Sequence, residues 1–165
     1  MNSDSVLGHQ GTHVVKSAKT THEIPGAPVV LVAATDSHVR SGLGAVLQSF
    51  AINTSWVTNL VDASGALAEK NISACLCGFW LEDKTYRELM RQVKSVAPNL
   101  PVIVASTPAC PDEYRVYLEA MNLGAFEFLC YPYRKPDLDR VLRQAIRAYA
   151  RRAWCPSVAA LRAAS

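Results

Sequence analysis

Long apolar runs are missing from this sequence. Its 165 residues contain no stretch of about 18 consecutive apolar residues, the length that a helix needs to cross a bilayer. Residues 1–28 are polar and lack the basic-then-apolar order of a secretory signal. We therefore expect a cytoplasmic protein that makes no contact with a membrane.

Cysteines are too few and too irregularly spaced for a disulfide framework. The chain has five, of which Cys75 and Cys77 share an apolar run, while Cys110, Cys130 and Cys155 are scattered. An odd number without framework spacing is typical of a reducing compartment. A zinc site needs about four ligands, and no second Cys or His pair lies at a suitable spacing. We interpret Cys75 and Cys77 as small core residues and expect no metal or other cofactor.

Motifs of the common enzyme classes are absent as well. No glycine-rich phosphate loop follows the first apolar run, where the chain reads Ala34-Thr35-Asp36-Ser37. No Ser-His-Asp or Cys-His arrangement is recognisable, and His38 is interpreted as a solvent-facing helix residue. We expect a protein without enzymatic activity. A small-molecule sensor that uses the crevice at the strand ends stays a less favoured alternative.

Apolar runs alternate with amphipathic segments along the middle of the chain. The runs at 29–34, 52–58, 74–81, 101–106 and 126–130 predict strands. Helices are predicted after Asp36 or Ser37, at 62–70, 83–97 and 112–122, and from Pro136 onward. Five strands that alternate with five helices predict right-handed crossovers and a parallel sheet covered on both faces. The fold class is therefore α/β, a doubly wound five-stranded sheet, with the short fifth strand at an edge.

Hydrophobic periodicity predicts which face each late helix buries. In the segment 112–122, which Gly124 ends, we expect four residues to face inward: Tyr114, Tyr117, Leu118 and Met121. In the last helix the expected buried stripe is Leu138, Val141, Leu142, Ala145 and Tyr149.

Two segments resemble the receiver domain of two-component response regulators. Residues 99–106, Asn-Leu-Pro-Val-Ile-Val-Ala-Ser, are similar to a Pro-Val-Ile strand that ends in a hydroxyl residue. Residues 124–133, Gly-Ala-Phe-Glu-Phe-Leu-Cys-Tyr-Pro-Tyr, are similar to the family pattern Gly-Ala-x-x-Phe-Leu-x-Lys-Pro-Phe. The resemblance implies a flavodoxin-like receiver fold with (βα)5 order over residues 27–152. We expect residues 1–26 to be a flexible leader and residues 153–165 to be a tail.

The resemblance also implies where phosphoryl transfer would take place. Receivers hold Mg²⁺ with two carboxylates at the end of strand one, beside an acceptor aspartate at the end of strand three. A hydroxyl after strand four and a lysine after strand five bind the phosphoryl oxygens. The corresponding residues here are Ala34, Thr35, Gly78, Ser106 and Tyr131. Only the hydroxyl of Ser106 matches, so the resemblance implies a degenerate phosphorylation site.

Acidic residues near these positions leave an alternative open. Asp36 follows the first strand, and Glu82 and Asp83 lie shortly after Gly78. Capping of the following helices is a sufficient explanation for Asp36 and Asp83. The favoured hypothesis is a pseudo-receiver that takes no phosphoryl group and binds other proteins in two-component signalling. The alternative is a response regulator phosphorylated on Asp36 or Asp83 with Mg²⁺.

The last part of the chain is basic. Residues 134–165 hold eight Lys or Arg and two acids, whereas the whole chain has a net charge of only +3. The predicted last helix carries arginines three and four residues apart, on the face opposite its apolar stripe: Arg140, Arg143, Arg147 and Arg151. This face is either a docking surface for an acidic partner or a solvated helix surface with cations near its C-terminal end.

In receivers, the fourth helix, fifth strand and fifth helix meet partners, and the resemblance implies the same surface here. We favour Phe128 over Phe126 as the outward-facing aromatic of strand five that couples to Ser106. The expected partner is a signalling protein, namely a kinase, another receiver or an output protein, and a homodimer stays open. Nucleic acid is disfavoured, because no helix-turn-helix follows and no aromatics alternate with the arginines.

Overall fold

Five parallel strands form one sheet in the computed structural model, which describes residues 24–82 and 84–154. The strands are β1 (Val29–Ala33), β2 (Asn53–Val57), β3 (Ile72–Gly78), β4 (Val102–Ala105) and β5 (Glu127–Leu129). Their order is β2-β1-β3-β4-β5, and every neighbouring pair is parallel. The predicted doubly wound sheet is confirmed, and β5 lies at an edge.

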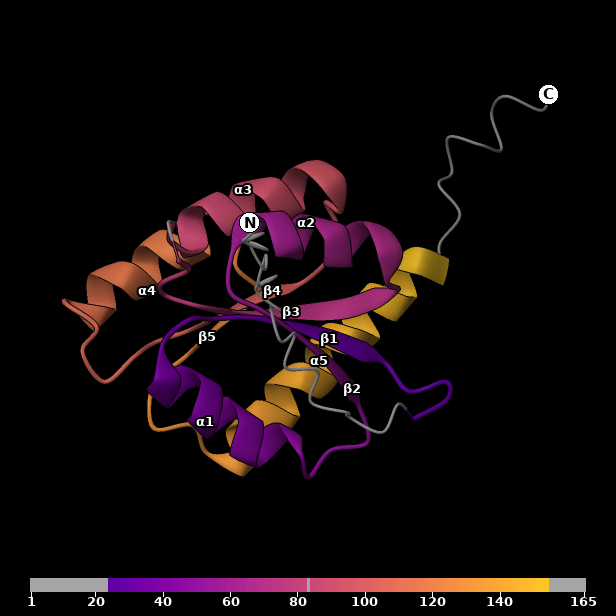
Figure 1. The fold of residues 1–165 in the computed structure, drawn as a ribbon, viewed down its shortest axis with the longest axis horizontal. Coiled ribbons are helices and arrows are strands. Elements are labelled where there is room, and N and C mark those ends of the chain that lie inside the picture. The colour runs from indigo at the N-terminus through magenta and orange to yellow at the C-terminus, as the bar shows by residue number, and fades with distance from the viewer. Residues whose placement is uncertain (1–23, 83, 155–165) are drawn as a thin grey trace, which may run out of the picture.

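Five helices cover the two faces of the sheet (Figure 1). They are α1 (Ser37–Leu47), α2 (Leu60–Glu69), α3 (Tyr86–Val96), α4 (Glu113–Asn122) and α5 (Lys135–Trp154). Helices α1 and α5 lie on one face, and α2, α3 and α4 lie on the other. No helix among the described residues has the length and apolar character that a membrane crossing requires.

Capping side chains set where the helices begin. Asp36 is the N-cap of α1, because its Oδ1 accepts hydrogen bonds from the backbone N–H of His38 and of Val39. Helix α3 begins at Tyr86, later than the sequence predicts, because Thr85 and Glu88 form a capping box there. Asp83, the expected cap, lies outside the described residues.

The hydrophobic core has two halves, one on each side of the sheet. Alternate residues of β1 show this, since Leu31 and Ala33 belong to one half and Val30 and Val32 to the other. All four are fully buried, as expected for a strand in the middle of a parallel sheet. The stripe predicted for α5 is confirmed: Leu138, Val141, Leu142 and Ala145 are buried, and Tyr149 is partly buried.

The expected inward face of α4 is wrong for three of its four residues, and only Met121 is partly buried against the core. Tyr114 is 71% exposed, and Tyr117 and Leu118 are exposed as well, whereas the small side chains of Val116 and Ala120 are buried. Small side chains let α4 lie close to the sheet, so the larger ones point outward. The tyrosines of α4 therefore form an aromatic surface on the outside of the domain.

Candidate functional site

The carboxyl ends of β1 and β3 are packed together without a polar side chain between them. Ala34 and Gly78 are both buried there. A Cβ atom placed on Gly78 would lie 3.0 Å from the Cβ of Ala34 and 3.5 Å from Cγ1 of Val39. A larger residue at position 78 therefore requires its neighbours to move.

The other residue expected in the acid pair, Thr35, is bound to the loop after β3. Its backbone N–H and its hydroxyl both donate to the carbonyl of Trp80, at 3.3 and 2.9 Å. The guanidinium of Arg40 donates to the carbonyl of Ala34 at 2.8 Å and lies over the ring of Trp56. The polar groups of this edge are thus used to join β1 to its neighbours.

Ser106, directly after β4, is almost completely buried and has hydrogen-bond partners for all its polar groups. Its backbone N–H donates to the carbonyl of Leu129 at 2.8 Å. Its hydroxyl accepts from the backbone N–H of Tyr131 at 2.9 Å, and its carbonyl accepts from the hydroxyl of Tyr133. Every one of these partners comes from β5 or from the segment after it.

Tyr133 is the residue of this region that sequence reasoning missed. Its ring packs against α1, where a Cβ atom on Gly42 would lie 3.1 Å from Cδ2 of Tyr133. Burial, with a smaller contribution from the carboxylate of Asp36, raises the pKa of the Tyr133 phenol well above its usual value. The signal was present in the sequence, since Tyr133 stands where the family pattern ends in phenylalanine. The added hydroxyl is the group that reaches Ser106.

The two described acids near these positions, Asp36 and Glu82, are engaged by other groups. Asp36 is engaged as the cap of α1. Glu82 is turned toward the end of β2, where it accepts a hydrogen bond from the hydroxyl of Thr58 at 2.6 Å. No group of three His, Cys, Asp or Glu in the described ranges is placed to hold a metal ion. Because Mg²⁺ prefers several oxygen ligands that include carboxylates, these residues do not fit a receiver-type magnesium site.

The two cysteines of β3 lie in the core, as the sequence indicates. Cys75 and Cys77 are both fully buried on the side of the sheet covered by α2, α3 and α4. Burial raises the pKa of the Cys75 thiol to about 12. Neither thiol is accessible to solvent.

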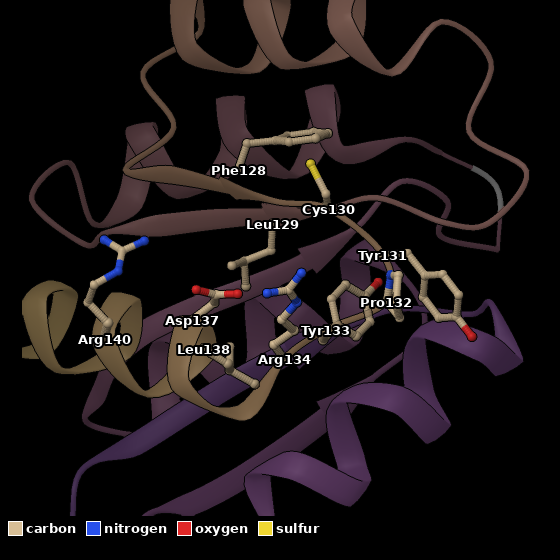
Figure 2. Close-up of a pocket in the computed structure, with 10 residues that line it drawn as sticks. All are labelled: Phe128, Leu129, Cys130, Tyr131, Pro132, Tyr133, Arg134, Asp137, Leu138 and Arg140. Carbon is tan, nitrogen blue, oxygen red and sulfur yellow. The ribbon is translucent and has the colours of Figure 1, made fainter.

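A hollow lies along β5, the segment that follows it and the start of α5. Its volume is about 440 Å³, and its lining includes Phe128, Cys130, Arg134, Asp137 and Arg140. Phe128 and Cys130 project to one side of β5, whereas the three charged residues lie on the other (Figure 2). We call this space the β5–α5 hollow.

Phe128 does not face outward as expected. It is only 8% exposed and belongs to the core. Its ring contacts Tyr117 of α4 edge-on, with ring centroids 5.9 Å apart, and Tyr117 in turn stacks on Tyr114. An aromatic row therefore leads from the core of β5 to the outside of α4.

The predicted row of arginines on α5 is exposed along its whole length. Arg143 bonds both carboxylate oxygens of Asp139 at 2.8 Å. Within the described part of the chain, Arg134, Arg140 and Arg147 form no ion pair. The structure also places Arg134 at the hollow, which sequence reasoning did not single out.

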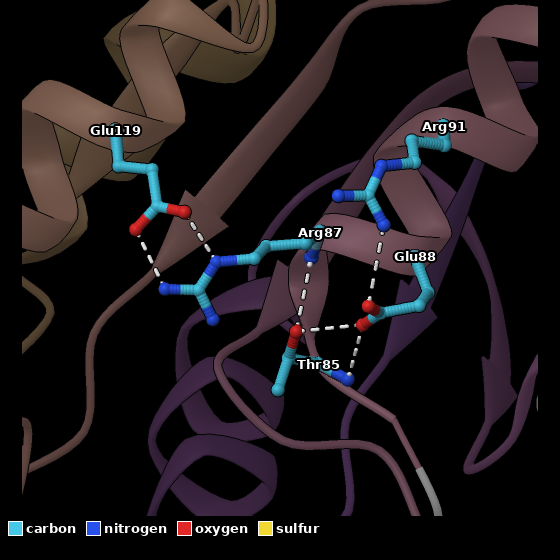
Figure 3. Close-up of polar contacts among 5 residues, drawn as sticks. All are labelled: Thr85, Arg87, Glu88, Arg91 and Glu119. Carbon is cyan, nitrogen blue, oxygen red and sulfur yellow. Dashed lines mark hydrogen bonds and ion pairs between the residues drawn. The ribbon is translucent and has the colours of Figure 1, made fainter.

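Arg87 of α3 and Glu119 of α4 form an ion pair with two hydrogen bonds (Figure 3). Nη2 of Arg87 donates to Oε2 of Glu119 at 2.6 Å, and Nε of Arg87 donates to Oε1. Arg87 holds the pKa of the Glu119 carboxyl below its usual value, and Glu119 raises that of Arg87. This ion pair links the outer side of α4 to α3.

Comparison with known proteins identifies the family. The chain is 30% identical over 125 residues to the two-component response regulator ORR11 of Oryza sativa. This alignment covers 73% of the chain and 83% of the relative. The chain is 25% identical over 118 residues to an NtrX-like response regulator of Rickettsia bellii, of which this covers 24%. No family model matches the chain.

Solved structures show the same fold. The signal receiver domain of an HD domain-containing protein from Pseudomonas fluorescens aligns with a TM-score of 0.69 at 17% identity, over 82% of this chain and 99% of that one. A response regulator receiver domain from Clostridium thermocellum gives 0.64 at 19% identity, over 73% and 94%. The chain belongs to the response regulators of two-component signalling and has the receiver fold. Its partners are accordingly signalling proteins.

Proposed function

We propose that this chain is a receiver that accepts no phosphoryl group, has no enzymatic activity and acts as a protein-interaction module in the cytoplasm. The observation that carries the proposal is the contact between Ala34 and Gly78, where a Cβ on Gly78 would lie 3.0 Å from that of Ala34. At these positions the family needs a carboxylate and an acceptor aspartate. Here the space is filled by backbone and methyl groups.

The remaining groups support the same conclusion. The hydroxyl of Ser106 and that of Thr35 are both engaged within the chain. Asp36 as a substitute acceptor is disfavoured, because its Oδ1 already accepts two backbone N–H groups.

The surface formed by α4, β5 and α5, which we call the partner face, supports the interaction role. It combines the exposed aromatic side chains Tyr114 and Tyr117 with the β5–α5 hollow and its arginines, Arg134 and Arg140. Exposed aromatic residues and arginines are enriched in protein interfaces. Unpaired guanidinium groups favour a partner that supplies carboxylates.

Charge reversal on the partner face tests this role. We expect Arg140→Glu to weaken binding to a panel of purified histidine kinases, phosphotransfer proteins and receivers, without any phosphodonor. The matched control is Lys94→Glu, which reverses an exposed cation on α3, away from the partner face. Equal binding by both variants, or no binding by the wild-type chain, would contradict the proposed interaction role.

A further inference from the structure

The connection between β4 and α4 is fastened at its first residue. The hydroxyl, the carbonyl and the backbone N–H of Ser106 all form hydrogen bonds with groups of β5 and of the segment after it. The rest of the connection runs from Thr107 to Asp112, and Pro108 and Ala109 within it are exposed. Ser106 therefore anchors this connection to the sheet.

Tyr133 joins three elements that are far apart in the sequence. Its hydroxyl donates to the carbonyl of Ser106 at the end of β4, and its ring lies against α1 at Gly42. The ring also meets that of Tyr131 edge-on, with centroids 5.6 Å apart. Gly42 accommodates the ring because it has no side chain, since a Cβ there would lie 3.1 Å from Cδ2 of Tyr133. The ring is thereby held at the position from which its hydroxyl reaches Ser106.

We propose that Tyr133, Ser106 and the backbone N–H of Tyr131 form a clasp that holds the β4–α4 connection in one arrangement. Tyr133 is a positioning residue in this clasp. Its hydroxyl donates a hydrogen bond to the carbonyl of Ser106, the first residue of the connection. Helix α4 follows this connection directly, and the ion pair between Arg87 of α3 and Glu119 adds a second contact in the C-terminal half of α4. The clasp therefore keeps the partner face in one shape without a bound phosphoryl group.

This inference rests on the proposed function only for the biological use of the partner face. The clasp itself is a set of hydrogen bonds within the chain. Amide hydrogen exchange therefore measures its effect without a partner or a phosphodonor. The clasp and the proposed function can consequently fail independently of each other.

Amide hydrogen exchange on the full chain tests the clasp. In Tyr133→Phe we expect amides of residues 106–113 to exchange about fivefold faster, the change that corresponds to the net contribution of one neutral hydrogen bond. Amides of β1 and β3 should keep their wild-type rates. The control is Tyr131→Phe, because the hydroxyl of Tyr131 makes no hydrogen bond among the described residues, and its exchange should match the wild type.

A second variant tests the clasp with Tyr133 left intact. Gly42→Ala places a methyl group against the Tyr133 ring, and we expect the same segment, 106–113, to exchange faster. Unchanged exchange of this segment in both Tyr133→Phe and Gly42→Ala would overturn the proposal. Equal acceleration across the whole sheet would overturn it too, because Tyr133 would then contribute only to global stability.

Discussion

The two halves of the carboxyl edge of the sheet differ in what their side chains do. At the ends of β1 and β3, Ala34 and Gly78 leave no polar side chain between the strands. At the ends of β4 and β5, Ser106 and Tyr133 hold a hydroxyl–carbonyl network in place. Both halves belong to the same parallel sheet and lie next to each other, since Gly78 pairs with Ala105.

This difference separates two tasks that receivers combine. The β1–β3 half is where the family carries out its chemistry, and in this chain it is closed by packing. The β4–β5 half is where the family transmits a change to its surface, and in this chain it is intact but fully hydrogen-bonded internally. Under the proposed function, the chain keeps the surface of a receiver without the reaction that switches other receivers.

The largest effect is expected from a side chain placed in the closed half. Gly78→Asp puts a carboxylate beside Ala34 without a partner, and we expect a loss of about 3 kcal/mol in the free energy of unfolding. Urea denaturation measures it. The control Gly65→Ala, at a helix position with no atom within 4 Å of the added Cβ, should keep or slightly raise stability. Wild-type stability in Gly78→Asp would mean that this half is not closed.

A smaller loss is expected from the hydrogen-bonded half. Ser106→Ala removes the acceptor of the Tyr131 N–H at a buried position, and we expect a loss of about 1–2 kcal/mol in the same measurement. Ser41→Ala is a suitable control, because the hydroxyl of Ser41 is exposed and bonds only carbonyls of its own helix. Equal stability of the two variants would remove the contrast between the halves.

The hydroxyl of Thr35, in the closed half, should contribute less to the free energy of unfolding than that of Ser106. Thr35→Val removes the hydroxyl donor to the carbonyl of Trp80, while the backbone N–H of residue 35 still donates to that carbonyl. We expect a loss of about 0.5–1 kcal/mol, measured by urea denaturation. A loss as large as that of Ser106→Ala would show that the β1 end depends on side-chain hydrogen bonding as strongly as the β4 end.

The smallest effect is expected from the pH dependence of stability at the N-terminus of α3, which lies outside both halves. Hydrogen bonds from the hydroxyl and the backbone N–H of Thr85 lower the pKa of Glu88 to about 2. Since the folded pKa lies below its ordinary value, the stabilising contribution is complete near neutral pH and is lost as the pH falls toward 2. We expect the free energy of unfolding of the wild type to exceed that of Glu88→Gln by less at about pH 3 than at about pH 6. Urea denaturation at the two pH values measures both free energies. A constant difference would contradict the capping role.

The order of strands and helices could be predicted from the sequence because it depends on local signals. Buried strands give continuous apolar runs, and Asp36 marks the start of α1. The orientation of α4 could not be predicted, because its large apolar residues suggest one buried face while packing selects the small ones, Val116 and Ala120. Helical periodicity alone does not distinguish a core stripe from an exposed interaction surface.

The candidate site shows the same limit. Matching to the family pattern singled out Ser106 and Tyr131, and the structure joins these two residues through a hydrogen bond. It missed Tyr133, because the contact of its hydroxyl with the carbonyl of Ser106 joins residues 27 positions apart. It also missed the close approach of Gly42 to the Tyr133 ring, which depends on the packing of α1.

The central claim, that the chain accepts no phosphoryl group, is tested most directly by intact-mass measurement after incubation with a small phosphodonor and Mg²⁺. We predict an unchanged mass. A phosphoryl adduct that hydroxylamine removes would contradict the account, because it would show that a carboxylate accepts the group despite the contact between Ala34 and Gly78. Loss of that adduct in Asp36→Asn would identify Asp36 as the acceptor.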